Sequence, residues 1–241
     1  LVFIYLSSYF YLNKRYKKLM IFERASAFRG KIMREILKLG IPISISVTAE
    51  AGLFSAVSIM IGTLGAIITS ANQIALNVIT VTFMVPLAIS AATTVKVGQS
   101  LGEADRVKAR DYALTGVFIC GLFMLISSCI LLLLRGSIID IYTGNIEIKD
   151  LAMSLLLVAA VFQIVDGIQI GAAGALRGYK DTKIPMIVNL FSYWVLAFPL
   201  SYLLGIVYRL PPSYIWLGFV LGLSVAAILL TSRLSKISKI L

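Results

Sequence analysis

Six long apolar runs without a lysine or arginine constrain this chain more than any other feature. Each is close to or above the ~20 residues that a helix needs to cross a bilayer. Hydrophobic residues make up 59% of the chain and charged residues only 14%, which a soluble domain of 241 residues could not bury. We therefore predict an all-α polytopic membrane protein. The predicted spans are residues 41–65, 70–95, 112–134, 151–176, 184–206 and 214–232.

The N-terminal part has a different pattern. Residues 1–12 are apolar but too short to cross a ~30 Å hydrocarbon core. Basic residues follow this stretch, whereas a signal peptide carries them before its apolar run. We expect 1–12 to be the truncated end of a preceding transmembrane helix. We interpret 13–40 as a basic linker with an amphipathic helix at the membrane interface, the alternative being a solvated connector.

The distribution of basic residues predicts the orientation in the membrane. Nine lie in 13–38, four in 96–110, three in 177–183 and three in 233–241. The alternating connections 66–69, 135–150 and 207–213 carry zero, two and one. Because short cytoplasmic loops are enriched in lysine and arginine, we expect the linker and the C-terminus to be cytoplasmic. The net charge of +11 thus reports topology rather than a nucleic-acid partner.

Two carboxylates lie deep inside predicted spans, at Glu50 and Asp166. Each is about ten residues from the cytoplasmic end of its span, or roughly 15 Å at 1.5 Å per residue. An unpaired carboxylate costs at least a few kcal/mol at that depth, so such residues usually face a cavity, a partner or an ion. We predict that both bind the coupling cation, Na+ or H+. The alternative is a purely structural role.

Polar neighbours extend this pattern. Gln163, Asp166 and Gln169 recur at three-residue steps and share one helix face. Such residues could equally bond across helix interfaces, and phenylalanines in spans usually only pack. Beside Asp166, glycines recur at helical spacing, which predicts close helix packing. The candidate cavity-lining residues are Ser46, Phe54, Gln73, Asn77, Phe162, Gln163, Asn189 and Tyr193.

Other site chemistries find little support in the sequence. The chain has no histidine, and its two cysteines share one apolar run, which argues against a zinc site or a disulfide scaffold. Asp166 is the one aspartate deep within a span, whereas an intramembrane aspartyl enzyme needs two. We therefore expect neither an enzyme nor a cofactor.

Several segments from Leu39 onward resemble the C-terminal lobe of the multidrug and toxic compound extrusion (MATE) family, in particular its NorM-type members. No single segment is diagnostic, but their order and spacing match. They are Gly-Ile-Pro at 40–42 with Glu50, Ala-Asn-Gln-Ile-Ala-Leu-Asn at 71–77, Val-Gly-Gln-Ser-Leu-Gly at 97–102, and the stretch 162–185 with Asp166, Gly-Ala-Leu-Arg-Gly at 174–178 and Lys-Asp-Thr at 180–182.

The resemblance implies a twelve-helix antiporter of two six-helix lobes that exports cationic or amphipathic drugs in exchange for Na+ or H+. Residues 13–40 would then be the inter-lobe linker, 41–234 the six-helix C-terminal lobe and 235–241 a short cytoplasmic tail. The partners would be drug-like molecules, the bilayer of the inner membrane and an N-terminal lobe. Carboxylates matching Glu50 and Asp166 bind the cation in such members. Phe162 departs from the tyrosine of some sodium-coupled members and offers no oxygen.

Three other functions remain open at this point. A lipid-linked oligosaccharide flippase of the same superfamily typically needs basic residues in its cavity, and no predicted span contains one. A passive channel or a structural membrane subunit could use the same polar stripe. Saturable exchange driven by an ion gradient would separate an antiporter from both.

Overall fold

The computed structural model describes residues 30–240, and every element within that range is helical. Six helical segments are long and apolar enough to cross a membrane, which confirms the predicted fold class. The fifth combines α7, η1, α8 and η2 into Lys183–Val207, and the sixth joins α9 and α10. The elements are α3 (Gly30–Gly62), α4 (Ala66–Gly102), α5 (Arg106–Asp140), α6 (Ile146–Gly178), α7 (Lys183–Leu190), η1 (Phe191–Ala197), α8 (Phe198–Tyr202), η2 (Leu203–Val207), α9 (Pro212–Ile215) and α10 (Leu217–Ile240).

The helices are longer than the predicted spans. α4 has 37 residues and α5 has 35, because the charged segments beside their apolar cores continue the helix. Lysine, arginine and glutamate are good helix formers, so hydropathy marks the membrane crossing but not the helix end. Residues 30–40 of the expected linker form the first turns of α3, and 235–240 of the expected tail continue α10. The expected helix end at 1–12 and the linker residues 13–29 lie outside the described residues.

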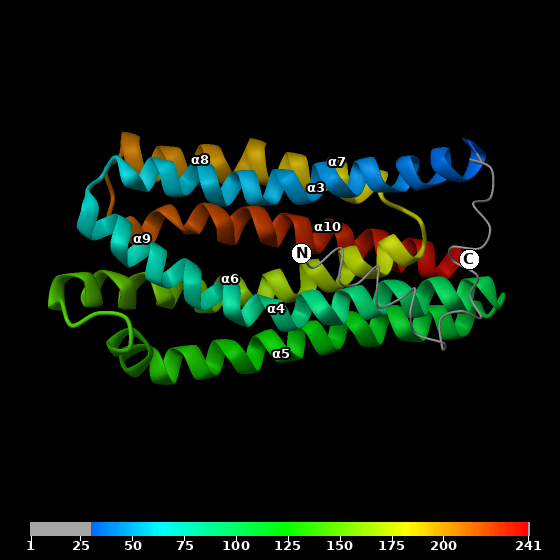
Figure 1. Cartoon of the computed structure of the whole chain (residues 1–241), viewed down its shortest axis with the longest axis horizontal. Helices are drawn as coiled ribbons and strands as arrows, with labels where there is room; N and C mark the ends of the chain where they lie inside the picture. Colours follow the sequence, from blue (N-terminus) through cyan, green and yellow to red (C-terminus); the bar gives the residue numbers. More distant parts are fainter. Residues whose placement is uncertain (1–29, 241) are drawn as a thin grey trace, which may run out of the picture. The chain divides into compact units, whose positions relative to one another are not determined.

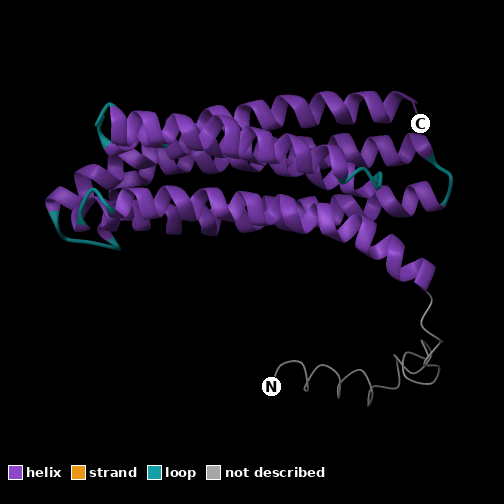
Figure 2. Ribbon diagram, turned by 90° about the horizontal axis from the view of Figure 1, so that it is seen from above, coloured by secondary structure: helices purple, strands orange, loops and turns teal. Residues whose placement is uncertain are grey.

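Short connections make consecutive helices antiparallel neighbours. Asp105 begins α5 by accepting a hydrogen bond from the Lys108 backbone N–H, at 2.9 Å. Asn145 begins α6 in the same way, accepting from the N–H groups of Glu147 and Ile148. Both side chains satisfy backbone donors that the first helical turn leaves free. Figure 2 shows the helices side by side with the connections at their two ends.

α6 is the central helix of the compact unit that begins at Leu39, because it contacts α4, α5 and α10. Its glycine stripe permits these contacts. A Cβ at Gly174 would lie 2.6 Å from the Ser90 carbonyl oxygen of α4, and one at Gly167 would lie 2.6 Å from Met124 of α5. The packing role predicted for this stripe is therefore confirmed. Ser90 and Thr94 also donate to backbone carbonyls of α6, at 2.8 and 2.7 Å.

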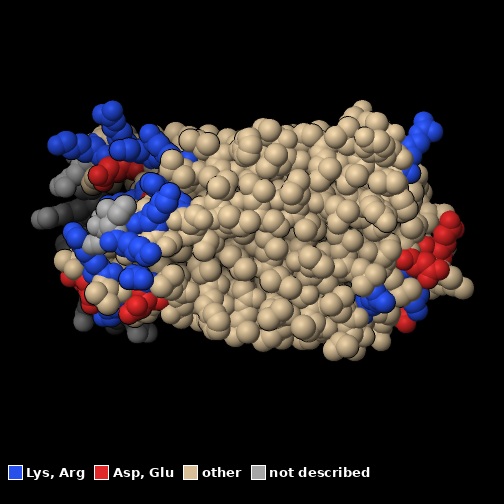
Figure 3. Space-filling model, turned by 180° about the vertical axis from the view of Figure 1, so that it is seen from behind, with Lys and Arg blue, Asp and Glu red and all other residues tan. Residues whose placement is uncertain are grey.

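The remaining helices complete the unit on the other side of α10. Figure 1 shows α3 beside α7 and α8. α10 lies between these three helices and the group of α4, α5 and α6. α10 contacts both α6 and the fifth crossing. Figure 3 shows lysines and arginines gathered at one end of the helices, a few charges of both signs at the other end, and an uncharged band between them. Such a band is expected where a helical protein meets lipid.

Candidate functional site

Glu50 lies beside the face of α3 that packs against the other helices. Ala49, Leu53 and Val57 are buried, with exposures of 6%, 0% and 1%, and fix that face against the other helices. Glu50, by contrast, is directed into a cavity, together with Ser46 and Phe54 one turn before and after it. The i, i+4 spacing of the three residues accounts for their shared direction.

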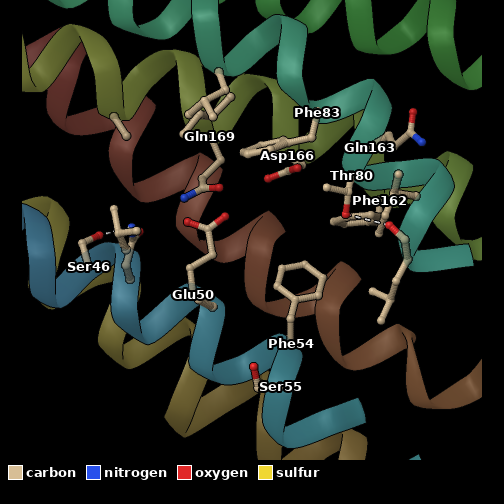
Figure 4. A pocket seen from close by; sticks show the side chains of 18 of the residues that line it. Ser46, Glu50, Phe54, Ser55, Thr80, Phe83, Phe162, Gln163, Asp166 and Gln169 are labelled. Atoms are coloured by element: carbon tan, nitrogen blue, oxygen red, sulfur yellow. Dashed lines mark hydrogen bonds between the residues drawn. The ribbon is translucent and has the colours of Figure 1, made fainter. Parts of the chain in front are cut away.

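Asp166 faces the same cavity from α6. It is 4% exposed, and its neighbours Gln163 and Gln169 are each 1% exposed. All three line the same cavity as Glu50. Figure 4 shows the side chains of Glu50, Asp166 and Gln169 pointing toward one another from α3 and α6. The two carboxylates therefore face each other across one cavity from two helices.

The cavity has a volume of about 760 Å³, within the ~300–1,000 Å³ range of small-molecule sites. Its walls are mainly apolar, with aromatic rings from three helices. Side chains of α3, α4 and α6 form most of the lining, with single contributions from α5 and α7. The lining residues are Ser46, Val47, Glu50, Ala51, Phe54, Ser55, Ser58, Ile59, Gln73, Leu76, Ile79, Thr80, Phe83, Leu87, Met124, Phe162, Gln163, Asp166, Gln169, Ile170, Ala173, Arg177 and Asn189.

Only some of the buried polar atoms around the cavity have a hydrogen-bond partner. Gln169 Nε2 donates to the Tyr193 hydroxyl at 2.7 Å, and Ser127 Oγ donates to Gln163 Oε1 at 3.1 Å. Within residues 30–240, Asp166 Oδ1 and Gln169 Oε1 are buried without a hydrogen-bond partner. Buried polar groups in native proteins are almost always paired, so these oxygens are available to a ligand.

The fifth crossing fixes the position of α3 around Glu50. Asn189 Nδ2 donates to Ser46 Oγ at 2.7 Å, and Trp194 Nε1 donates to the Ala49 carbonyl at 3.2 Å. Gly52 leaves room for the Trp194 ring, since a Cβ there would lie 3.1 Å from it. These contacts place the turn that carries Glu50 against η1 and α7.

Phe162 belongs to an aromatic cluster that reaches the cavity wall. Its ring centroid lies 6.4 Å from that of Phe54 and 6.2 Å from that of Trp216, the latter in an edge-to-face arrangement. Phe54 stacks on Phe219 at 4.7 Å. A phenyl ring provides no oxygen for an ion. Within residues 30–240, no group of three or more His, Cys, Asp or Glu side chains could hold a metal ion.

Two of the candidate cavity-lining residues lie outside the cavity. The Tyr193 side chain is fully buried between helices, where its hydroxyl accepts the hydrogen bond from Gln169. Asn77 is directed toward α5, where its Oδ1 accepts a hydrogen bond from the Tyr142 hydroxyl at 2.9 Å. Each polar group is thus hydrogen-bonded to a residue of a neighbouring helix. The other six candidates line the cavity together with Glu50 and Asp166.

The sequence analysis missed one charged residue of the lining, Arg177. The predicted fourth span ended at residue 176, whereas α6 continues to Gly178. Arg177 follows Asp166 by eleven residues, close to three turns of 3.6 residues, so both lie on one face. That spacing was readable in the sequence. No predicted span contains a basic residue, but the cavity lining does, because Arg177 lies one residue beyond the predicted end of the fourth span.

The fold and the cavity define the class of this chain: a polytopic α-helical membrane protein with two carboxylates in a cavity among its membrane-crossing helices. The MatE family model matches residues 42–203. The chain therefore belongs to the MatE family.

Relatives and solved structures agree with this assignment. The chain is 40% identical over 96% of its length to the "Probable multidrug resistance protein NorM" of Xanthomonas campestris pv. campestris, covering 50% of that protein. It is 38% identical over 98% of its length to the protein of the same name from Acinetobacter baylyi, covering 53% of it. The chain thus spans about half the length of these relatives.

Similar folds occur among solved structures. The crystal structure of the eukaryotic MATE transporter AtDTX14 has a TM-score of 0.85 at 22% identity, with 97% of this chain and 53% of that chain covered. An outward-facing multidrug resistance MATE family transporter of the MOP superfamily has a TM-score of 0.77 at 16% identity, with 83% and 44% covered. These similarities show a shared fold.

Proposed function

We propose that this chain is the C-terminal lobe of a secondary active antiporter that exports cationic or amphipathic drugs in exchange for Na+ or H+. The observation that carries the proposal is the convergence of Glu50 and Asp166, from two helices, on one cavity. Two carboxylates that repel each other in a site of low dielectric constant gain stability when a cation arrives. Such a pair can therefore exchange one cation for another.

The cavity also suits a bulky cationic substrate. Its volume of about 760 Å³ accommodates a drug-sized molecule. Phe54, Phe83 and Phe162 offer aromatic surface near the carboxylates, and aromatic faces attract cations. The relatives named multidrug resistance protein NorM support the same substrate class.

We further propose alternating access between two lobes, because the relatives are about twice as long as this chain. The cavity of this lobe would face a central pathway shared with an N-terminal lobe. Cation binding at Glu50 and Asp166 would shift the balance between outward-open and inward-open states. The inner membrane, with the basic end of the helices cytoplasmic, is the expected location.

An oligosaccharide flippase is the weaker alternative. Arg177 supplies a basic residue to the cavity, which removes the argument that no such residue is present. However, the same cavity holds two carboxylates, which would repel a pyrophosphate-linked substrate. The multidrug resistance names of the relatives also favour drug efflux.

The test is efflux of a fluorescent cationic dye from proteoliposomes that contain the full-length protein, under an imposed Na+ or H+ gradient. We expect one gradient to drive efflux and Asp166→Asn to abolish that dependence, because the amide cannot exchange a cation. Asp150→Asn is the matched control, since Asp150 is exposed near the start of α6. Failure of both gradients with folded wild-type protein would refute antiport, and saturable transport of a lipid-linked oligosaccharide would then support the flippase.

A further inference from the structure

The cavity contains a third charge for which cation exchange has no evident use. Among the lining residues within 30–240, the charged side chains are Arg177, Glu50 and Asp166. At 1.5 Å per residue, Arg177 lies about 16 Å along the α6 axis from Asp166. Its position at the last turn of α6 would also suit the helix dipole, as for many basic residues. Its surroundings distinguish it from an ordinary residue of the last turn.

Arg177 is partly buried in the cavity wall, between the buried residues Leu176 and Gly178. Lys180 and Lys183, the other basic residues of the α6 end and the turn that follows, are exposed. The nearby carboxylate of Asp181 is paired with Arg233 of α10, at 2.8 Å. Arg177 therefore does not share in the ion pairing of this turn.

Arg177 shares the cavity with Glu50 and Asp166 instead. Opposite charges that line one largely apolar cavity attract each other across it, so the guanidinium can act on the Glu50 carboxylate of the facing helix. The two groups form no ion pair, because Arg177 is absent from the three ion pairs found within residues 30–240. With both carboxylates ionised, the three charges leave the cavity with a net charge of −1. That value matches one monovalent cation.

We propose that Arg177 is the resident counter-cation of Glu50, and that an entering cation must compete with its guanidinium for this carboxylate. The arginine is a positioning residue that acts through Glu50, and it belongs to the same site as the proposed antiport. It weakens cation binding enough for the cation to be released. It also supplies a positive charge to Glu50 when the cavity is empty.

The probe for this proposal is tritiated tetraphenylphosphonium, whose fixed positive charge does not titrate. Equilibrium binding is measured on the purified full-length protein. We expect Arg177→Gln to bind the probe about tenfold more tightly than the wild type. The substitution removes a positive charge that repels the probe and competes with it for the Glu50 carboxylate. Arg177→Lys keeps the charge and should stay within about twofold of the wild type.

Matched variants separate this role from a structural one. Arg233→Gln removes an arginine that pairs outside the cavity and should leave the affinity unchanged. In a Glu50→Gln background the gain from Arg177→Gln should shrink to about threefold or less, because the competition for Glu50 has disappeared. Arg177→Met preserves the apolar stem, and it replaces Arg177→Gln if that variant does not fold.

The outcomes distinguish this proposal from the proposed function. Unchanged or weaker binding in both neutral variants would overturn the counter-cation role, as would an equal gain with and without Glu50. If Glu50→Gln weakens binding in those same experiments, the cation site itself stands. If Glu50→Gln leaves the binding of the probe unchanged, Glu50 does not attract cations, and this inference fails with the proposed cation site. If the wild type does not bind the probe, the cavity does not accept a cationic substrate, and this inference fails with the proposed substrate class.

Discussion

Tyr193 shows how a residue can organise the cavity without lining it. Its hydroxyl accepts the hydrogen bond from Gln169 Nε2, which leaves Gln169 Oε1 free beside Asp166. Tyr193 was a candidate for the cavity wall, with a bond to a neighbouring helix as the alternative. The sequence could not show that a glutamine of another helix already satisfies its hydroxyl.

Replacing Tyr193 by phenylalanine removes this acceptor and leaves the buried Gln169 amide without a partner. An unsatisfied buried donor costs about 1–3 kcal/mol, so we expect Tyr193→Phe to lower the apparent Tm of the purified full-length protein. Tyr208→Phe is the control, because Tyr208 is 67% exposed. Equal melting temperatures for the two variants would show that the hydrogen bond does not stabilise the protein.

The helices were predictable in number and type, but not in their ends or regularity. Long uncharged apolar runs identify membrane crossings because backbone groups must be satisfied internally in lipid. The π-helical turns of η1 and η2 leave no such signal in the sequence; in the structure η1 contacts α10 and α3, and η2 contacts α9. Arg177 was missed for a related reason: a charged residue ends a hydropathy window but does not end a helix.

The contact between α4 and α6 gives a prediction for glycine substitutions. A Cβ at Gly174 would collide with the side chain and carbonyl of Ser90, so Gly174→Ala should destabilise the protein by about 1–3 kcal/mol. Gly136 in α5 has no atom within 4 Å of its added Cβ, and alanine there should be neutral or stabilising by up to about 1 kcal/mol. The apparent Tm values should move in opposite directions or differ clearly. A stabilised Gly174→Ala variant would contradict the close packing.

Basic residues are distributed unevenly between the two ends of the described helices. The end where α4 meets α5 is rich in lysine and arginine, and the opposite end, where α5 meets α6, has few. Arg177 ends α6 at the basic end, with Glu50 and Asp166 deeper in the cavity. If the basic end is cytoplasmic, Arg177 lies on the cytoplasmic side of the two carboxylates.

Cysteine labelling tests this orientation in the full-length protein. Cys120 and Cys129 are first replaced by alanine, and a single cysteine is then introduced by Glu103→Cys or Gly144→Cys, both at exposed positions. A membrane-impermeant maleimide should label Gly144→Cys in intact cells and Glu103→Cys only after permeabilisation. Labelling of both variants after permeabilisation controls for expression and reactivity. The reverse pattern would place Arg177 on the outer side of the carboxylates, where it would repel a coupling cation before that cation reached Glu50.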